Sequence, residues 1–263
     1  MFPEPVLRVA GIEVTPFSLL YVAGLVAGMW LALRLARDQG VRRTLMIDLA
    51  MVGGVAAFVA AWATQRAGSL AGLDGMPGQA MVSIPAMLAA QALWLRIRPN
   101  ARRGQGEAQR KCESPVLDTV VPAVALGHAI TRVGCLCAGC CYGTPAWNLP
   151  WAVTYSHPAS SSAYRGVPVH PTPIYDAMAN LAILALLLSL RQRGVFRGTL
   201  VWVYLSTYGC ARFVIEFCRG DATVIAGALT IGQWLSLAWV TVGGAVVTRR
   251  LYRSARSQSR QPR

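Results

Sequence analysis

Two arginines and a glutamate stand out because they lie within apolar stretches. Arg132 and Arg212 each lie near the end of such a stretch, and Glu216 follows Arg212 by four residues. Side chains at positions i and i+4 share one face of a helix, so Arg212 and Glu216 can pair. Ionisable groups in apolar segments are costly and are therefore functional candidates; a structural ion pair that fixes helix packing is the alternative. Two guanidinium groups at one depth suit a phosphate, which arginine binds through paired hydrogen bonds.

Four further polar residues are candidates for the same site. His128 precedes the first arginine by one helical turn, and it is either a hydrogen-bonded packing group or a catalytic group. Tyr175 and Asp176 follow a proline-rich helix start, and Tyr21 lies in the outer part of the first apolar stretch. If successive helices alternate in direction, these side chains reach the same level as the two arginines.

Four of the seven cysteines gather within residues 134–143, namely Cys135, Cys137, Cys140 and Cys141. Three interpretations stay open: structural thiols or a local disulfide in an oxidising exterior, thiol-redox or thiol-transfer chemistry, and a soft-metal site for Cu(I) or zinc. The adjacent Arg132 can lower the pKa of a thiol. A structural zinc site usually has two separated ligand pairs, and the sequence shows no second pair.

The elements that must position these residues are long apolar helices. The chain has 263 residues, of which 54% are hydrophobic and 14% charged, against about 25% charged in a soluble domain. Seven apolar runs have about the length that crosses a bilayer core: 15–33, 44–62, 79–95, 116–138, 173–190, 198–217 and 229–248. We therefore predict an all-α integral membrane protein with seven transmembrane helices.

The charge distribution predicts the orientation. A net charge of +14 is compatible with nucleic-acid binding, but 19 of the 25 basic residues lie in alternate connections and the C-terminal segment, at 34–43, 96–111, 191–197 and 249–263. The positive-inside rule makes these segments cytoplasmic and the N-terminus external. We expect a membrane partner and no nucleic acid, one membrane domain over 1–248 with an external loop at 140–172, and a basic cytoplasmic tail at 249–263. Residues 1–14 lack the basic start of a cleavable signal.

Four sequence segments resemble a known family: residues 131–143, 170–176, 208–221 and 229–233. The first is similar to a Gly-Arg-x-Gly-Asn signature with two later glycines, and the second to His-Pro-Ser/Thr-Gln-Leu-Tyr-Glu. The third, which runs from Tyr208 through Arg212 and Glu216 to Asp221, is the closest match. On these motifs the chain resembles the prolipoprotein diacylglyceryl transferases, seven-span bacterial membrane enzymes with an external N-terminus.

The resemblance implies a reaction and a site. The reaction moves diacylglyceryl from phosphatidylglycerol to the lipobox cysteine thiol of a prolipoprotein at the outer leaflet of the bacterial cytoplasmic (inner) membrane, without metal or cofactor. The implied substrate-binding residues are Tyr21, Arg132, Gly134, Tyr175, Asp176 and Arg219. The implied catalytic residues are Arg212 and Glu216, with His128 or His170 as the base.

The chain departs from the family pattern at several polar positions. Cys135, Ala138 and Cys140 stand where the signature has Asn, Asn and Glu, and Asp176 replaces a Glu. The expected His-Gly-Gly stretch is absent from residues 68–78. Two alternatives therefore stay open: the same fold used as a thiol-redox or metal-handling membrane protein, and a non-catalytic lipid-binding scaffold.

Overall fold

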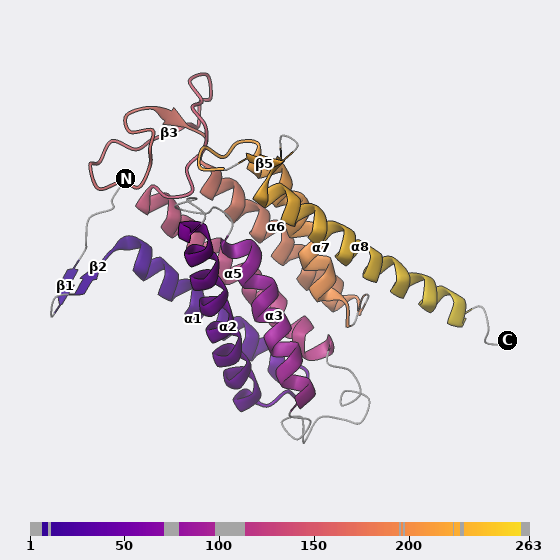
Figure 1. The fold of residues 1–263 in the computed structure, drawn as a ribbon. Coiled ribbons are helices and arrows are strands. Elements are labelled where there is room, and N and C mark those ends of the chain that lie inside the picture. The colour runs from indigo at the N-terminus through magenta and orange to yellow at the C-terminus, as the bar shows by residue number, and fades with distance from the viewer. Residues whose placement is uncertain are drawn as a thin grey trace.

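The computed structural model describes residues 7–9, 12–70, 79–97, 114–194, 196, 198–222, 224–226 and 229–258. Long helices form a bundle, and short strands and loops gather at one end of it (Figure 1). The helices are α1 (Pro16–Arg37), α2 (Arg43–Leu70), α3 (Gln79–Ile97), α5 (Ser114–Ala138), α6 (Thr172–Gln192), α7 (Leu200–Glu216) and α8 (Ile231–Gln258).

Each of these helices overlaps one of the predicted apolar runs. Within the described residues, five are long and apolar enough to cross a membrane: α1, α2, α5, α6 and α8. The apolar part of α3, Met81–Ile97, is shorter, and α7 has 17 residues. The helical, multi-pass membrane character is thus confirmed, whereas the count of seven spans and the orientation stay predictions.

The described residues contain three two-stranded antiparallel sheets, one before α1 and two in connections between helices. β1 (Leu7–Val9) pairs with β2 (Ile12–Val14), and β3 (Val153–Thr154) pairs with β4 (Pro168–Val169) in the long connection between α5 and α6. β5 (Val224–Ala226) pairs with β6 (Leu229–Thr230) between α7 and α8. β3 and β5 lie at the end of the bundle where α5 and α7 end and α6 and α8 begin (Figure 1).

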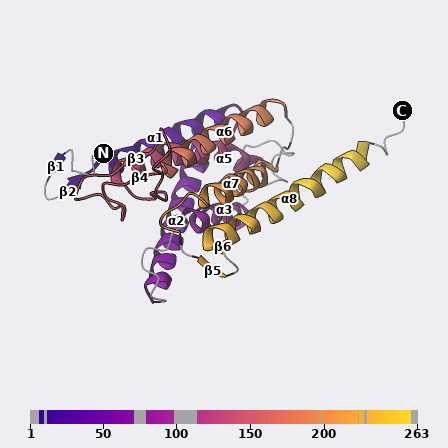
Figure 2. The ribbon, with the colours of Figure 1, turned by 90° about the horizontal axis from the view of Figure 1, so that it is seen from above.

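The helices pack in the order that places the candidate residues together. α5 packs against α1 and α6, α7 packs against α6 and α8, and α2 packs against α3. Gly24 and Gly127 face each other, and a Cβ on Gly24 would lie 2.7 Å from the Gly127 carbonyl oxygen. Small residues of this kind let two membrane helices approach closely. The C-terminal half of α8 extends away from the bundle (Figure 2).

Side-chain caps fix several helix starts. Thr15 and Ser18 form a reciprocal capping box at the start of α1. Buried Asp118 of α5 accepts hydrogen bonds from the backbone N–H groups of Gly198 and Leu200, the latter at 2.9 Å. Asp118 therefore satisfies the free donors that open α7 and joins α5 to α7 at the end of the bundle opposite the candidate site.

Candidate active site

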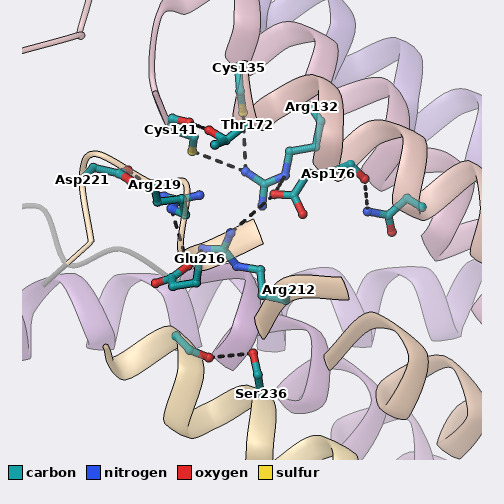
Figure 3. Close-up of polar contacts among 12 residues, drawn as sticks. Arg132, Cys135, Cys141, Thr172, Asp176, Arg212, Glu216, Arg219, Asp221 and Ser236 are labelled. Carbon is teal, nitrogen blue, oxygen red and sulfur yellow. Dashed lines mark hydrogen bonds and ion pairs between the residues drawn. The ribbon is translucent and has the colours of Figure 1, made fainter. Parts of the chain in front are cut away.

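Buried Asp176 of α6 joins the two arginines that the sequence singled out. Arg132 Nε of α5 lies 3.3 Å from Asp176 Oδ2, and Arg212 Nη1 of α7 lies 3.7 Å from the same oxygen (Figure 3). All three side chains are buried. Buried charges persist when opposite charges compensate them, so three successive helices are held together at one level. The structure thus brings Arg132, Asp176 and Arg212, three of the predicted site residues, into contact.

The ion pairs continue from α7 into the connection that follows it. Arg212 Nη2 lies 2.6 Å from Glu216 Oε2, and Arg219 Nε lies 3.7 Å from the same Glu216 oxygen. Arg219 Nη2 donates to Asp221 Oδ2 at 2.6 Å. We call the six residues Arg132, Asp176, Arg212, Glu216, Arg219 and Asp221 the ion-pair network. Its three positive and three negative charges alternate, so each buried charge has an opposite neighbour.

The start of α8 supports Glu216. Thr230 and Gln233 cap α8 reciprocally: Thr230 N donates to Gln233 Oε1 at 3.0 Å, and Gln233 N donates to Thr230 Oγ1 at 3.2 Å. The Thr230 hydroxyl also donates to Glu216 Oε1 at 2.9 Å. A Cβ on Gly232 would overlap the Glu216 carboxylate. Glu216 therefore lies against a helix N-terminus, where the helix dipole stabilises negative charge.

The cysteines converge because of the way α5 ends. Gly139 has a φ of 72°, its N–H donates to the Leu136 carbonyl, and the Cys140 N–H donates to the Cys135 carbonyl. This is a Schellman motif, in which the side chains corresponding to Cys135 and Cys140 normally touch. Only glycine suits position 139, because a Cβ there would also overlap the Ser160 hydroxyl.

Cys141 continues this turn toward the ion-pair network. Its φ of 56° is unusual for a residue with a side chain, and the Thr172 hydroxyl donates to its carbonyl. Arg132 Nη1 lies 3.3 Å from the Cys141 sulfur and 4.0 Å from the Cys135 sulfur. The sulfurs of Cys135, Cys140 and Cys141 lie within 4.8 Å of one another; we call these three residues the thiol cluster. Cys137 of α5 is outside it.

The two thiols beyond the end of α5 differ in acidity. Hydrogen bonds from the Cys135 and Cys140 thiols, helped by the positive charge of Arg132, lower the pKa of Cys141 well below its usual range. The pKa of Cys140 is raised, because hydrogen bonding with the Cys135 and Cys141 thiols and burial both favour its protonated form. The thiol cluster can therefore carry negative charge at Cys141, next to a guanidinium group. In the neighbouring ion-pair network, burial raises the pKa of Asp221, against the opposing effect of Arg219.

The other predicted residues lie around this centre. His128 Nε2 accepts a hydrogen bond from Arg132 Nε at 3.0 Å, and its ring lies 5.2 Å from that of Tyr208. The Tyr175 hydroxyl accepts a hydrogen bond from Trp151 Nε1 at 2.9 Å and lies 3.3 Å from His170 Nδ1. His128 thus contacts the ion-pair network directly, whereas Tyr175 and His170 pair with each other near Trp151 of the loop between α5 and α6.

Tyr21 and Gly134, two predicted substrate-binding residues, make packing contacts with residues of α1. Tyr21 is 47% exposed and stacks on Phe17 of α1. A Cβ on Gly134 would lie 3.3 Å from both Leu20 and Phe17, so Gly134 permits the close packing of α1 on α5. Most of residues 68–78, where the family's His-Gly-Gly stretch is missing, lies outside the described residues.

Sequence reasoning missed the residues that hold this centre in place. Thr230 and Thr172 each bond to a partner far along the chain, Glu216 and Cys141, and no local pattern predicts such contacts. The Thr-x-x-Gln spacing at 230–233 is a capping-box signal that could have marked the start of α8, but not its contact with Glu216.

The fold and the site define a class: a multi-pass helical membrane protein with a buried, arginine-rich centre at one end of its bundle. A profile of the family described as prolipoprotein diacylglyceryl transferase matches residues 107–249. This range exceeds half of the chain and contains the whole ion-pair network. The chain belongs to the prolipoprotein diacylglyceryl transferase family, as the sequence motifs predicted.

Individual relatives agree with this assignment. The phosphatidylglycerol–prolipoprotein diacylglyceryl transferase of Clostridium tetani is 35% identical over 128 residues, which are 49% of this chain and 50% of that protein. Proteins of the same name from Finegoldia magna and Gloeobacter violaceus are each 29% identical, over 89% and 98% of this chain and 90% and 96% of theirs. The chain thus spans about half the length of the first relative and nearly all of the other two. These names favour a transferase over a redox protein, a metal-handling protein or a scaffold.

Proposed function

We propose that this chain transfers a diacylglyceryl group from phosphatidylglycerol to the lipobox cysteine of a prolipoprotein, at the outer leaflet of a bacterial cytoplasmic membrane. The observation that carries the proposal is the pair Arg132 and Arg212, held on either side of Asp176 at the end of the bundle. The names of the relatives supply the two substrates. The chemistry of these substrates requires a buried cationic group at membrane depth.

The reaction forms one bond and breaks another. The substrate thiolate attacks the carbon of the diacylglyceryl group that carries the phosphate ester. A carbon–sulfur bond forms, the bond from that carbon to the ester oxygen breaks, and glycerol phosphate leaves. Negative charge develops on the departing phosphate, and preorganised guanidinium groups stabilise such charge most effectively in a site that excludes water. Arg132 and Arg212 are the groups proposed for this role.

The ion-pair network keeps these arginines ready for the phosphate. Glu216 holds Arg212 through Nη2 at 2.6 Å, while Arg212 Nη1 and both Asp176 oxygens form no hydrogen bond within the described part of the chain. Unused donors on a buried guanidinium group favour an additional anionic partner. In this proposal Arg212 binds the phosphate through Nη1, which faces Asp176 at 3.7 Å without a hydrogen bond. Glu216 and Asp176 set the orientation of the guanidinium group.

The structure favours His170 over His128 as the base that removes the thiol proton. The Nε2 atom of His128 already accepts a hydrogen bond from Arg132. A proton on this atom would therefore place a positively charged imidazolium against a guanidinium group. His170 is half-buried beside the outer loop and contacts the Tyr175 hydroxyl through Nδ1. A peptide thiol arriving from outside would meet His170 first in the proposed orientation.

The choice between the histidines is testable by substitution. We expect His170→Ala to lower transfer by about 10²-fold or more, the usual contribution of a general base. His157, in the loop between α5 and α6, is the other histidine outside the bundle core. His157→Ala serves as the matched control and should transfer at the wild-type rate. Equal rates for His170→Ala and wild type would remove His170 from the mechanism.

The activity itself is tested by complementation. Cells depleted of their own transferase should regain lipoprotein modification when they express this chain, as measured by the mass of a reporter lipoprotein. A catalytically inactive scaffold would bind phosphatidylglycerol but leave the reporter unmodified. Membrane insertion of the chain is checked in the same cells, so that failure to insert is not read as failure to act.

A further inference from the structure

Among the residues that the structure describes, the thiol cluster is a group of reactive side chains that the proposed transfer does not use. Cys135, Cys140 and Cys141 bring three sulfurs within 4.8 Å of one another. All three are free thiols. The Schellman motif places the first two in contact, and the left-handed backbone at Cys141 brings the third toward them. The backbone conformation therefore brings these three cysteines together.

The surroundings of the cluster suit negatively charged sulfur. Arg132 Nη1 lies 3.3 Å from the Cys141 sulfur and 4.0 Å from the Cys135 sulfur. Cys135 is buried, and Cys140 and Cys141 are half-buried. Donors that bond to the outer side of ligating atoms fix and tune metal sites. A nearby guanidinium group also offsets the charge that remains when three thiolates bind one cation.

The size and donor type of the cluster select the class of ligand. Thiolates prefer soft metal ions such as Cu(I) and zinc. A metal ion about 2.3 Å from each of three sulfurs in one plane needs sulfur pairs about 4 Å apart. This separation is compatible with sulfurs that all lie within 4.8 Å of one another. Among the described residues, no histidine, carboxylate or fourth cysteine joins this group, and three-coordinate binding by thiolates is typical of Cu(I).

We propose that Cys135, Cys140 and Cys141 form a three-thiolate site for one thiophilic d10 metal ion, with Cu(I) as the best match. Binding releases the thiol protons to solvent and leaves the Arg132 contact with Cys141 outside the metal's coordination sphere. Because Arg132 also pairs with Asp176, the metal site would share an arginine with the candidate active site. This inference goes beyond the proposed transfer and does not depend on it.

The test measures Cu(I) binding to the full-length chain in detergent. The reduced protein is titrated with Cu(I) without oxygen, in competition with a chromophoric Cu(I) chelator. We expect one equivalent to bind, and the triple variant Cys135→Ser/Cys140→Ser/Cys141→Ser to lose that binding. Cys137→Ser is the matched control, because Cys137 belongs to the same sequence motif but lies outside the thiol cluster, and it should bind as wild type does.

A single substitution keeps the test valid if the triple variant does not fold. Cys141→Ser should weaken Cu(I) binding by at least about tenfold, a loss that even changes outside the coordination sphere produce. Two results would overturn the proposal. The first is a reduced wild type that binds no more Cu(I) than the triple variant or Cys141→Ser, and the second is a loss of binding in Cys137→Ser equal to that in Cys141→Ser. The assay involves no lipid transfer, so its failure leaves the proposed function standing.

Discussion

At the scale of single residues, the site depends on alternating buried charges. Asp176 lies between Arg132 and Arg212, and Glu216 lies between Arg212 and Arg219. Taking one member away leaves an opposite charge buried without its partner, which is costly in a medium of low dielectric constant. The network therefore serves both to hold three helices together and to present guanidinium groups.

Asp176→Asn tests this dependence. The substitution keeps the size of the side chain but removes the charge that two guanidinium groups share, so we expect the free energy of unfolding to fall by about 3–5 kcal/mol. Thermal or denaturant unfolding in detergent measures the change. Asp38→Asn is the control, since Asp38 is exposed after α1, and it should stay within about 0.5 kcal/mol of wild type. Equal stability of the two variants would show that the network does not hold the fold.

The sequence predicted part of this centre and missed the rest for a physical reason. The spacing of Arg212 and Glu216 specifies their contact, because helix geometry alone brings positions i and i+4 together. The role of Asp176 as a bridge depends on how α5, α6 and α7 pack, and the contact of Thr230 with Glu216 depends on α8. Long-range contacts of this kind have no local sequence pattern.

At the scale of elements, close backbone packing positions Arg132. α1 packs against α5 through Gly24 and Gly127, whose carbonyl oxygens each lie within 3 Å of the place where the other's Cβ would be. Helix association in a membrane relies on such packing, because lipid offers no hydrophobic driving force between helices. The apolar runs predicted the helices themselves, but not which pairs touch.

Gly24→Val tests the α1–α5 contact. A branched side chain would force the two backbones apart, so we expect a loss of about 1–3 kcal/mol in the free energy of unfolding. Gly54→Val is the matched control, because a Cβ on Gly54 meets nothing within 4 Å although it also lies in a long apolar helix. A Gly24→Val protein as stable as Gly54→Val would contradict the packing described for α1 and α5.

At the scale of the whole molecule, the arginines predict how the bundle sits in the membrane. We propose that the 1–248 membrane domain has its N-terminus and the loop between α5 and α6 outside, and the basic segment 249–263 in the cytoplasm. The structure agrees in one respect: the ends of α5 and α7 and the starts of α6 and α8 meet at one end of the bundle (Figure 1), so the ion-pair network lies at the end assigned to the outside.

Reporter fusions test this orientation. An enzyme that is active only in the cytoplasm should be active when fused after residue 263, whereas a reporter active only outside should be active when inserted at exposed Gly166 in the α5–α6 loop. The positive-inside rule provides the reason, since the short connections rich in arginine are retained on the cytoplasmic side. The reverse pattern of activity would invert the topology and place the ion-pair network at the inner leaflet.

The most direct test of the account is transfer by the purified chain itself. Wild type in vesicles of phosphatidylglycerol is mixed with a lipobox peptide, and mass spectrometry follows the diacylglyceryl group on the cysteine while released glycerol phosphate is measured. We expect transfer by wild type, a rate lower by at least about 10²-fold for Arg212→Ala, and a wild-type rate for Arg165→Ala, whose arginine is exposed in the loop. No transfer by the inserted wild type, or an unchanged rate for Arg212→Ala, would contradict the account.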